Sequence, residues 1–118
     1  MPDDAHAVPF REILSTLVDL HAPGVRAAIF CDDEGEKVGA FAVDGVDPYE
    51  VDLLGAACAP IAQALPPNAA VRVILADRAV WLARVDAGYF LAVLAERCRD
   101  GSVRLDLLRA VAALAAHM

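Results

Sequence analysis

The sequence is poor in basic residues. It carries 10 lysines and arginines against 17 aspartates and glutamates, for a formal net charge of −7 and an isoelectric point near 4.7. An acidic surface repels phosphate backbones and anionic lipid headgroups. We therefore expect neither nucleic acid nor a charged membrane surface among the partners, while a basic patch on a partner protein remains compatible.

Long apolar runs and paired cysteines are also missing. No segment reaches the roughly 18 charge-free apolar residues of a transmembrane helix, and the acidic start MPDDAHAVPF lacks the basic residues of a secretory signal. The three cysteines, Cys31, Cys58 and Cys98, form neither a CxxC pair nor an even framework. We expect reduced thiols, packed as small hydrophobic side chains at Cys31 and Cys58, in a cytoplasmic protein.

Motifs for catalysis, nucleotides or metals are absent as well. The sequence has no GxxxxGK[ST] motif, and His6, His21 and His117 show no metal-ligand spacing. We expect His21 to complement the dipole at the end of the first helix. The acidic cluster Asp32–Glu36 lacks the register of a calcium loop and is interrupted by Gly35 at turn spacing, so we interpret it as a solvated hairpin tip. The sequence predicts a non-enzymatic protein with no cofactor and no metal.

What the sequence has in excess is apolar side chains, which make up 58% of its 118 residues, many of them alanine. This content predicts extensive burial, and the length suits one domain with a core of its own. We expect residues 1–8 to form a loose lead-in and residues 9–118 to form a single domain.

Apolar periodicity and turn residues predict eight elements. The first helix begins at Pro9 and ends before Pro23, the second begins at Pro48 with Asp47 as its N-cap, and the last begins near Ser102. The predicted strands are 25–31, 37–43, 71–75, 80–85 and 89–95. Their short loops allow only antiparallel neighbours. The prediction is an α/β fold of the α+β kind, in the order α-β-β-α-β-β-β-α, with a five-stranded antiparallel sheet and helices on both faces.

The middle helix, expected over residues 48–65, lacks a polar face. In its segment Leu53–Pro66, LLGAACAPIAQALP, only Gln63 has a polar side chain. A helix on the surface of a globular protein normally keeps a polar side toward water. We therefore expect a partner surface here, most simply a second copy of the chain. Pro60 costs about 3 kcal/mol in a helix interior, so the helix either kinks there or consists of two pieces.

Several local segments, taken together, resemble one family. They are the Pro23–Val25 segment (PGV) before the first strand, the D-x-x-G turn from Asp32 to Gly35, and the segment DAGYFLAVL from Asp86 to Leu94. In this order and spacing the chain resembles the roadblock (dynein light chain) family, which has a profilin-like fold. The resemblance extends from Phe10 to the last helix.

The resemblance implies a regulatory function. Roadblock proteins form dimers in which the middle helices pack together and the third strands pair, and bacterial members often accompany a small Ras-like GTPase as activator or scaffold. Carried onto this sequence, it implies a homodimer and a GTPase partner. The implied interface consists of Leu53, Leu54, Ala57, Cys58, Ile61, Leu65, Val71, Val73 and Leu75. Cys58 would then lie near its own mate.

Other interpretations remain open beside this one. The chain could instead be a structural subunit or a small-ligand-sensing module on the same profilin-like sheet. Among Arg72, Arg78 and Arg84, only Arg78 is expected at a hairpin tip, from which an arginine finger could reach a GTPase; we interpret it as a solvated side chain. We expect Trp81 and Tyr89 to serve in core or interface packing.

Overall fold

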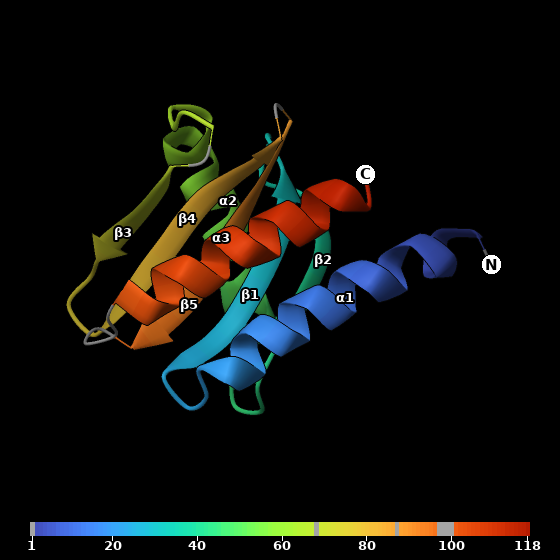
Figure 1. Ribbon diagram of the computed structural model, residues 1–118. Coiled ribbons are helices and arrows are strands. Elements are labelled where there is room, and N and C mark those ends of the chain that lie inside the picture. The colour runs from blue at the N-terminus through green and yellow to red at the C-terminus, as the bar shows by residue number, and fades with distance from the viewer. Residues whose placement is uncertain (1, 68, 87, 97–100) are drawn as a thin grey trace.

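The computed structural model describes residues 2–67, 69–86, 88–96 and 101–118. The described residues form three helices and five strands in the predicted order (Figure 1). The elements are α1 (Pro2–Leu20), β1 (Val25–Asp32), β2 (Lys37–Ala42), α2 (Pro48–Gln63), β3 (Ala70–Ile74), β4 (Arg78–Asp86), β5 (Tyr89–Glu96) and α3 (Gly101–Ala116). No helix among these residues is long and apolar enough to cross a membrane.

The strands form one antiparallel sheet in the order β2-β1-β5-β4-β3. The central strand β5 is buried from Phe90 to Ala95, on both faces of the sheet. This burial follows from its unbroken apolar sequence, which predicted cover on both sides. The strands β2 and β3 form the two edges.

Helices cover both faces of the sheet, as predicted. On one face α1 and α3 lie side by side in opposite directions (Figure 1), over a core that includes Leu17, Phe30, Trp81 and Leu107. On the other face α2 packs over a second core built largely from β1, β4 and β5. Tyr89 packs against the first core, so Trp81 and Tyr89 both serve in packing, as expected.

The start of α1 differs from the prediction. The helix begins at Pro2 and not at Pro9, so residues 2–8 are its first turns. Pro2 offers the same first-turn proline signal as Pro9, and Asp3 and Asp4 follow it where acidic residues favour a helix N-terminus. The domain boundary at residue 9 stays a prediction.

The β1–β2 turn is built as its sequence indicates. Asp32 Oδ1 accepts hydrogen bonds from the backbone N–H groups of Glu34 (3.0 Å) and Glu36 (2.9 Å), and Gly35 has a positive φ of 89°. The Asp32 carboxylate thus stabilises the turn through hydrogen bonds to its backbone. Within the described residues, no group of three or more metal-ligating side chains occurs.

The helix α2 begins as predicted, with Asp47 accepting a hydrogen bond from the Tyr49 backbone N–H at 2.9 Å. It is one continuous helix with Pro60 inside it, which excludes the alternative of two pieces. Pro60 lies in the last turn, three residues before the helix ends at Gln63. A proline there interrupts the hydrogen-bond pattern only where the helix is about to end.

Candidate partner-binding surface

The outer side of α2 is an uninterrupted apolar row. Its sheet-facing residues, among them Val51 and Cys58, are buried, and its outward residues are spaced three or four apart. We call the outward row, together with the C-cap residue Ala64, the α2 stripe: Tyr49, Leu53, Ala56, Ala57, Pro60, Ile61 and Ala64. Tyr49, Leu53 and Ile61 are 68%, 50% and 42% exposed. An apolar row about 20 Å long on the surface is typical of a protein interface.

The polar side chains of α2 lie on the flanks of the helix, where they contact other segments of the domain. Asp52 pairs with Lys37 of β2 at 3.1 Å, Glu50 pairs with Arg78 of β4, and Gln63 donates a hydrogen bond to the Asp33 carbonyl. These contacts tie the flanks of α2 to the rest of the domain. They leave no charged side chain on the α2 stripe.

A close approach of two glycines fixes how α2 lies on the sheet. A Cβ atom on Gly55 would lie 2.9 Å from the Gly35 carbonyl oxygen and 3.0 Å from Cys31 Sγ. The β1–β2 turn can therefore contact the helix backbone directly only because Gly55 has no side chain. This contact sets the rotation of α2 about its axis, and with it the residues that form the α2 stripe.

The edge strand β3 borders the same surface. The Leu75 N–H donates to the Arg78 carbonyl at 2.8 Å, so alternate β3 residues bond to β4 while the backbone groups of the others, such as Ala70 and Ile74, point away from it. Val71 and Val73 are half-buried against the core beneath α2. An edge strand whose backbone groups point away from the sheet is a template for pairing with another chain.

The nine predicted interface residues divide into three groups. Four are exposed: Leu53, Ala57, Ile61 and Leu75. Four are half-buried and pack against the core beneath α2: Leu54, Leu65, Val71 and Val73. Cys58 is only 6% exposed and packs against the sheet, so the single chain offers little of its side chain to a partner. Contact of all nine residues with a partner stays a prediction.

Sequence reasoning missed Tyr49, which is more exposed than Leu53 and Ile61 of the α2 stripe, and Ile74 on β3. Tyr49 was detectable, because it lies four positions before Leu53 and a helix places such residues on one side.

The two described cysteines are free thiols inside the α2-face core, as expected. Burial raises the pKa of Cys31 to about 12, with a smaller contribution from the nearby Asp32 carboxylate. Burial also raises the pKa of Cys58 to about 11. Both side chains therefore stay protonated and behave as small hydrophobic groups. Cys98 lies outside the described residues, as does the side chain of His6.

The three arginines each have a structural contact. Arg78 pairs with both Glu50 and Asp77, so two carboxylates hold the side chain that the sequence indicated to be solvated. The Arg72 guanidinium lies 5.5 Å from the centre of the Trp81 ring. Arg84 donates a hydrogen bond to the Leu65 carbonyl at 3.1 Å.

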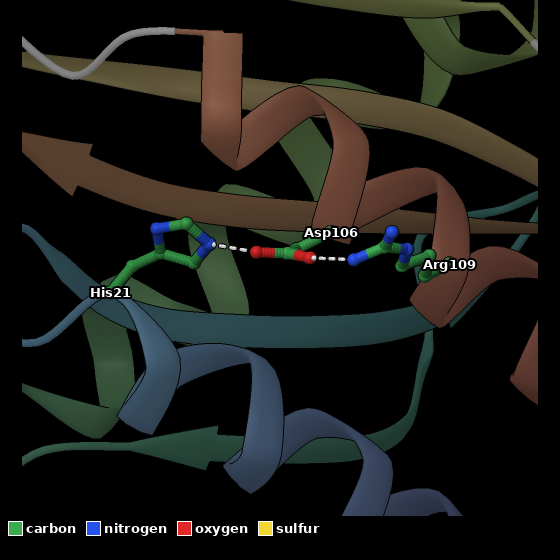
Figure 2. A network of polar contacts seen from close by, with 3 residues as sticks. All are labelled: His21, Asp106 and Arg109. Carbon is green, nitrogen blue, oxygen red and sulfur yellow. Dashed lines mark hydrogen bonds and ion pairs between the residues drawn. The ribbon is translucent and has the colours of Figure 1, made fainter.

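A polar network on the opposite face involves His21, Asp106 and Arg109 (Figure 2). His21 Nε2 lies 2.7 Å from Asp106 Oδ2, and Arg109 Nη1 donates to Asp106 Oδ1 at 3.1 Å. His21 thus has a carboxylate as its partner where the helix dipole was expected, and the Asp106 side chain is mostly buried. The network ties the C-terminal end of α1 to the start of α3.

The whole architecture recurs in solved bacterial structures. The gliding protein MglB from Thermus thermophilus superposes with a TM-score of 0.81 over 96% of this chain and 90% of its own, at 17% identity. The Roadblock/LC7 domain from Streptomyces avermitilis superposes with a TM-score of 0.69 over 86% and 90%, at 22% identity. The chain has the roadblock/LC7 fold.

A further MglB structure, described as having a tetrameric arrangement, superposes with a TM-score of 0.82 over 96% of this chain and 90% of its own, at 18% identity. No family model matches the sequence. No curated protein matches it either. The roadblock/LC7 fold therefore agrees with the resemblance noted from the sequence, and it rests on three-dimensional similarity.

Proposed function

We propose that this chain is a non-enzymatic, homodimeric regulator or scaffold that binds a small Ras-like GTPase in the cytoplasm. The observation that carries the proposal is the α2 stripe next to the open edge of β3. The stripe carries no charged group that a partner would have to desolvate, and both surfaces belong to the same side of the molecule.

A second copy of the chain suits this surface. In a two-fold dimer each copy offers the same patch, so a self-complementary apolar row is sufficient for contact. Ala56, Ala57 and Ala64 are small enough to let two helices approach closely. Pairing of two β3 strands would satisfy the backbone groups that point away from β4.

A protein partner fits the rest of the molecule better than a small charged ligand does. The net charge of −7 disfavours phosphate groups, and the sequence lacks a P-loop of its own. The roadblock/LC7 fold and the tetrameric arrangement described for one MglB support self-association. The GTPase is proposed because the resemblance to roadblock proteins implies it.

Light scattering coupled to size exclusion tests the first half of the proposal. We expect a mass twice that of the 12.5 kDa chain. For the second half, a small Ras-like GTPase loaded with GDP or with a non-hydrolysable GTP analogue is added, and co-elution and GTP hydrolysis are measured. A monomer that binds the GTPase in neither nucleotide state would overturn the proposal.

A further inference from the structure

The groove between α1 and α3 lies on the face of the sheet opposite the α2 stripe. It has a volume of about 570 Å³. Its floor includes Leu17 of α1 and Ala110 of α3, which are both buried, and the half-buried Ala113. Alanine at positions 110 and 113 leaves the space that larger side chains would fill. The small side chains of these two α3 residues therefore create the groove.

The ends of the groove are held by contacts between the two helices. At one end His21 bonds to Asp106 at 2.7 Å (Figure 2). At the other end the His117 ring meets the Phe10 ring edge-on, with 6.5 Å between their centres. Because both ends are fixed, the groove is present before any ligand arrives.

The charge along the groove is negative. Glu12 lines it, and its exposed carboxylate forms no ion pair with any described residue. Asp19, also exposed, follows seven positions later, about two turns further along the same side of α1. On α3, the charges of Asp106 and Arg109 are paired with each other. Glu12 thus lines the groove beside its apolar floor, and Asp19 lies on the same side of α1 just outside the lining residues.

We propose that this groove binds a basic amphipathic helix from a partner protein. The stretch from Asp106 to His117 is about 16 Å long, which matches three turns of a helix. Apolar side chains on one face of that helix would rest on the floor and on Leu20, which is 64% exposed. Lysines or arginines two turns apart would face Glu12 and Asp19.

The charge favours this occupant over two others. An acidic helix would meet Glu12 and Asp19 as like charges, and so would a second copy of this chain, whose net charge is −7. The groove lies on the far side of the sheet from the α2 stripe (Figure 1), so it stays accessible whether or not the chain dimerises through α2.

A synthetic peptide tests the groove on the full chain. The probe is an amidated peptide of about 15 residues, with leucines at helical spacing and lysines elsewhere, and its control carries glutamate in place of every lysine. We expect the lysine peptide to bind at least about tenfold more tightly by fluorescence anisotropy. Amide shifts of the ¹⁵N-labelled protein should change along α1 and α3. Equal binding of the two peptides, or shifts confined to α2, would overturn the proposal.

Two pairs of variants locate the binding. Ala113→Leu fills the groove and should weaken peptide binding about tenfold, whereas Ala112→Leu, on the exposed side of α3, should leave it unchanged. Glu12→Lys should weaken binding more than Glu34→Lys, which makes the same change in net charge at the distant β1–β2 turn. If the members of both pairs bind alike, the groove is not the site. If an apolar dye shifts the groove amides while the lysine peptide does not bind, the groove takes a small ligand and the proposal is wrong.

Discussion

At the scale of single residues, Gly55 shows how one missing side chain positions a surface. It lies where the β1–β2 turn touches α2, and the backbone of Gly35 and the Cys31 thiol occupy the space around it. The α2 stripe points outward because this contact fixes the helix. The residue with no side chain thus determines which side chains a partner would meet.

Gly55→Ala should destabilise the protein although alanine favours helices. The added Cβ would lie 2.9 Å from the Gly35 carbonyl oxygen, so the turn and the helix must separate. We expect the free energy of unfolding in urea to fall by roughly 1–3 kcal/mol, despite a gain of about 1 kcal/mol in helix propensity. Gly88→Ala is the control, because a Cβ there meets nothing within 4 Å. A Gly55→Ala protein as stable as the parent would show that the contact is unimportant.

The buried thiols predict a loss of stability at alkaline pH. An unfolded Cys31 ionises above its ordinary pKa of 9.0, whereas burial raises the pKa of the folded thiol to about 12. Between these two pKa values the unfolded state therefore binds fewer protons than the folded state. Its free energy relative to the folded state falls as pH rises, so the protein becomes less stable. The loss should reach roughly 1 kcal/mol per thiol at pH 10. Unfolding curves from pH 8 to pH 10.5 should show a shallower decline in Cys31→Ala; an equal slope in both proteins would contradict this account.

At the scale of elements, the sequence predicted where helices and strands occur better than how they face one another. Asp47 and Pro48 set the start of α2 because a cap and a first-turn proline act locally. The side of α2 that faces the sheet was not predictable in the same way. A helix that is apolar all round has no periodicity to indicate its buried side. That side is chosen by the glycine contact with a turn about 20 positions away.

The polar contacts between elements could not be predicted from the sequence either. His21 and Asp106 lie 85 positions apart, and Arg78 meets Glu50 across two different elements. Neither pair has a helical or cross-strand spacing that marks it in advance. The sequence therefore predicted the helix and the strand of the candidate surface. The ion pairs on its flanks were found only in the structure.

The His21–Asp106 contact should couple α1 to α3 energetically. Both side chains are mostly buried, so removing either one leaves the other with an unsatisfied polar atom. In a double-mutant cycle with His21→Ala and Asp106→Ala, we expect a coupling of roughly 0.5–3 kcal/mol in the free energy of unfolding. Arg109→Ala should cost far less, because its side chain is 70% exposed. Additive effects of the two alanine variants would refute the coupling.

At the scale of the whole molecule, the two faces of the sheet differ in chemistry. The α2 side is an apolar surface without charge on its outer row, which suits a second copy of the same chain. The α1–α3 side has an apolar groove beside carboxylates, which suits a basic partner. Because the sheet separates them, a dimer built on one side leaves two copies of the other side available.

Ile61→Asp tests the face on which this arrangement depends. Ile61 lies on the α2 stripe and is 42% exposed in the single chain, so an aspartate is well solvated in a monomer. In a dimer through α2 it would be buried as an unpaired charge, at a cost of several kcal/mol. We expect light scattering to show the 12.5 kDa chain alone, with an unchanged far-UV circular dichroism spectrum. Ala57→Asp should act in the same way, while Leu105→Asp, at an exposed position on α3, should remain dimeric. If Ile61→Asp and Ala57→Asp both stay dimeric, the copies meet elsewhere and the α2 stripe is left for another partner.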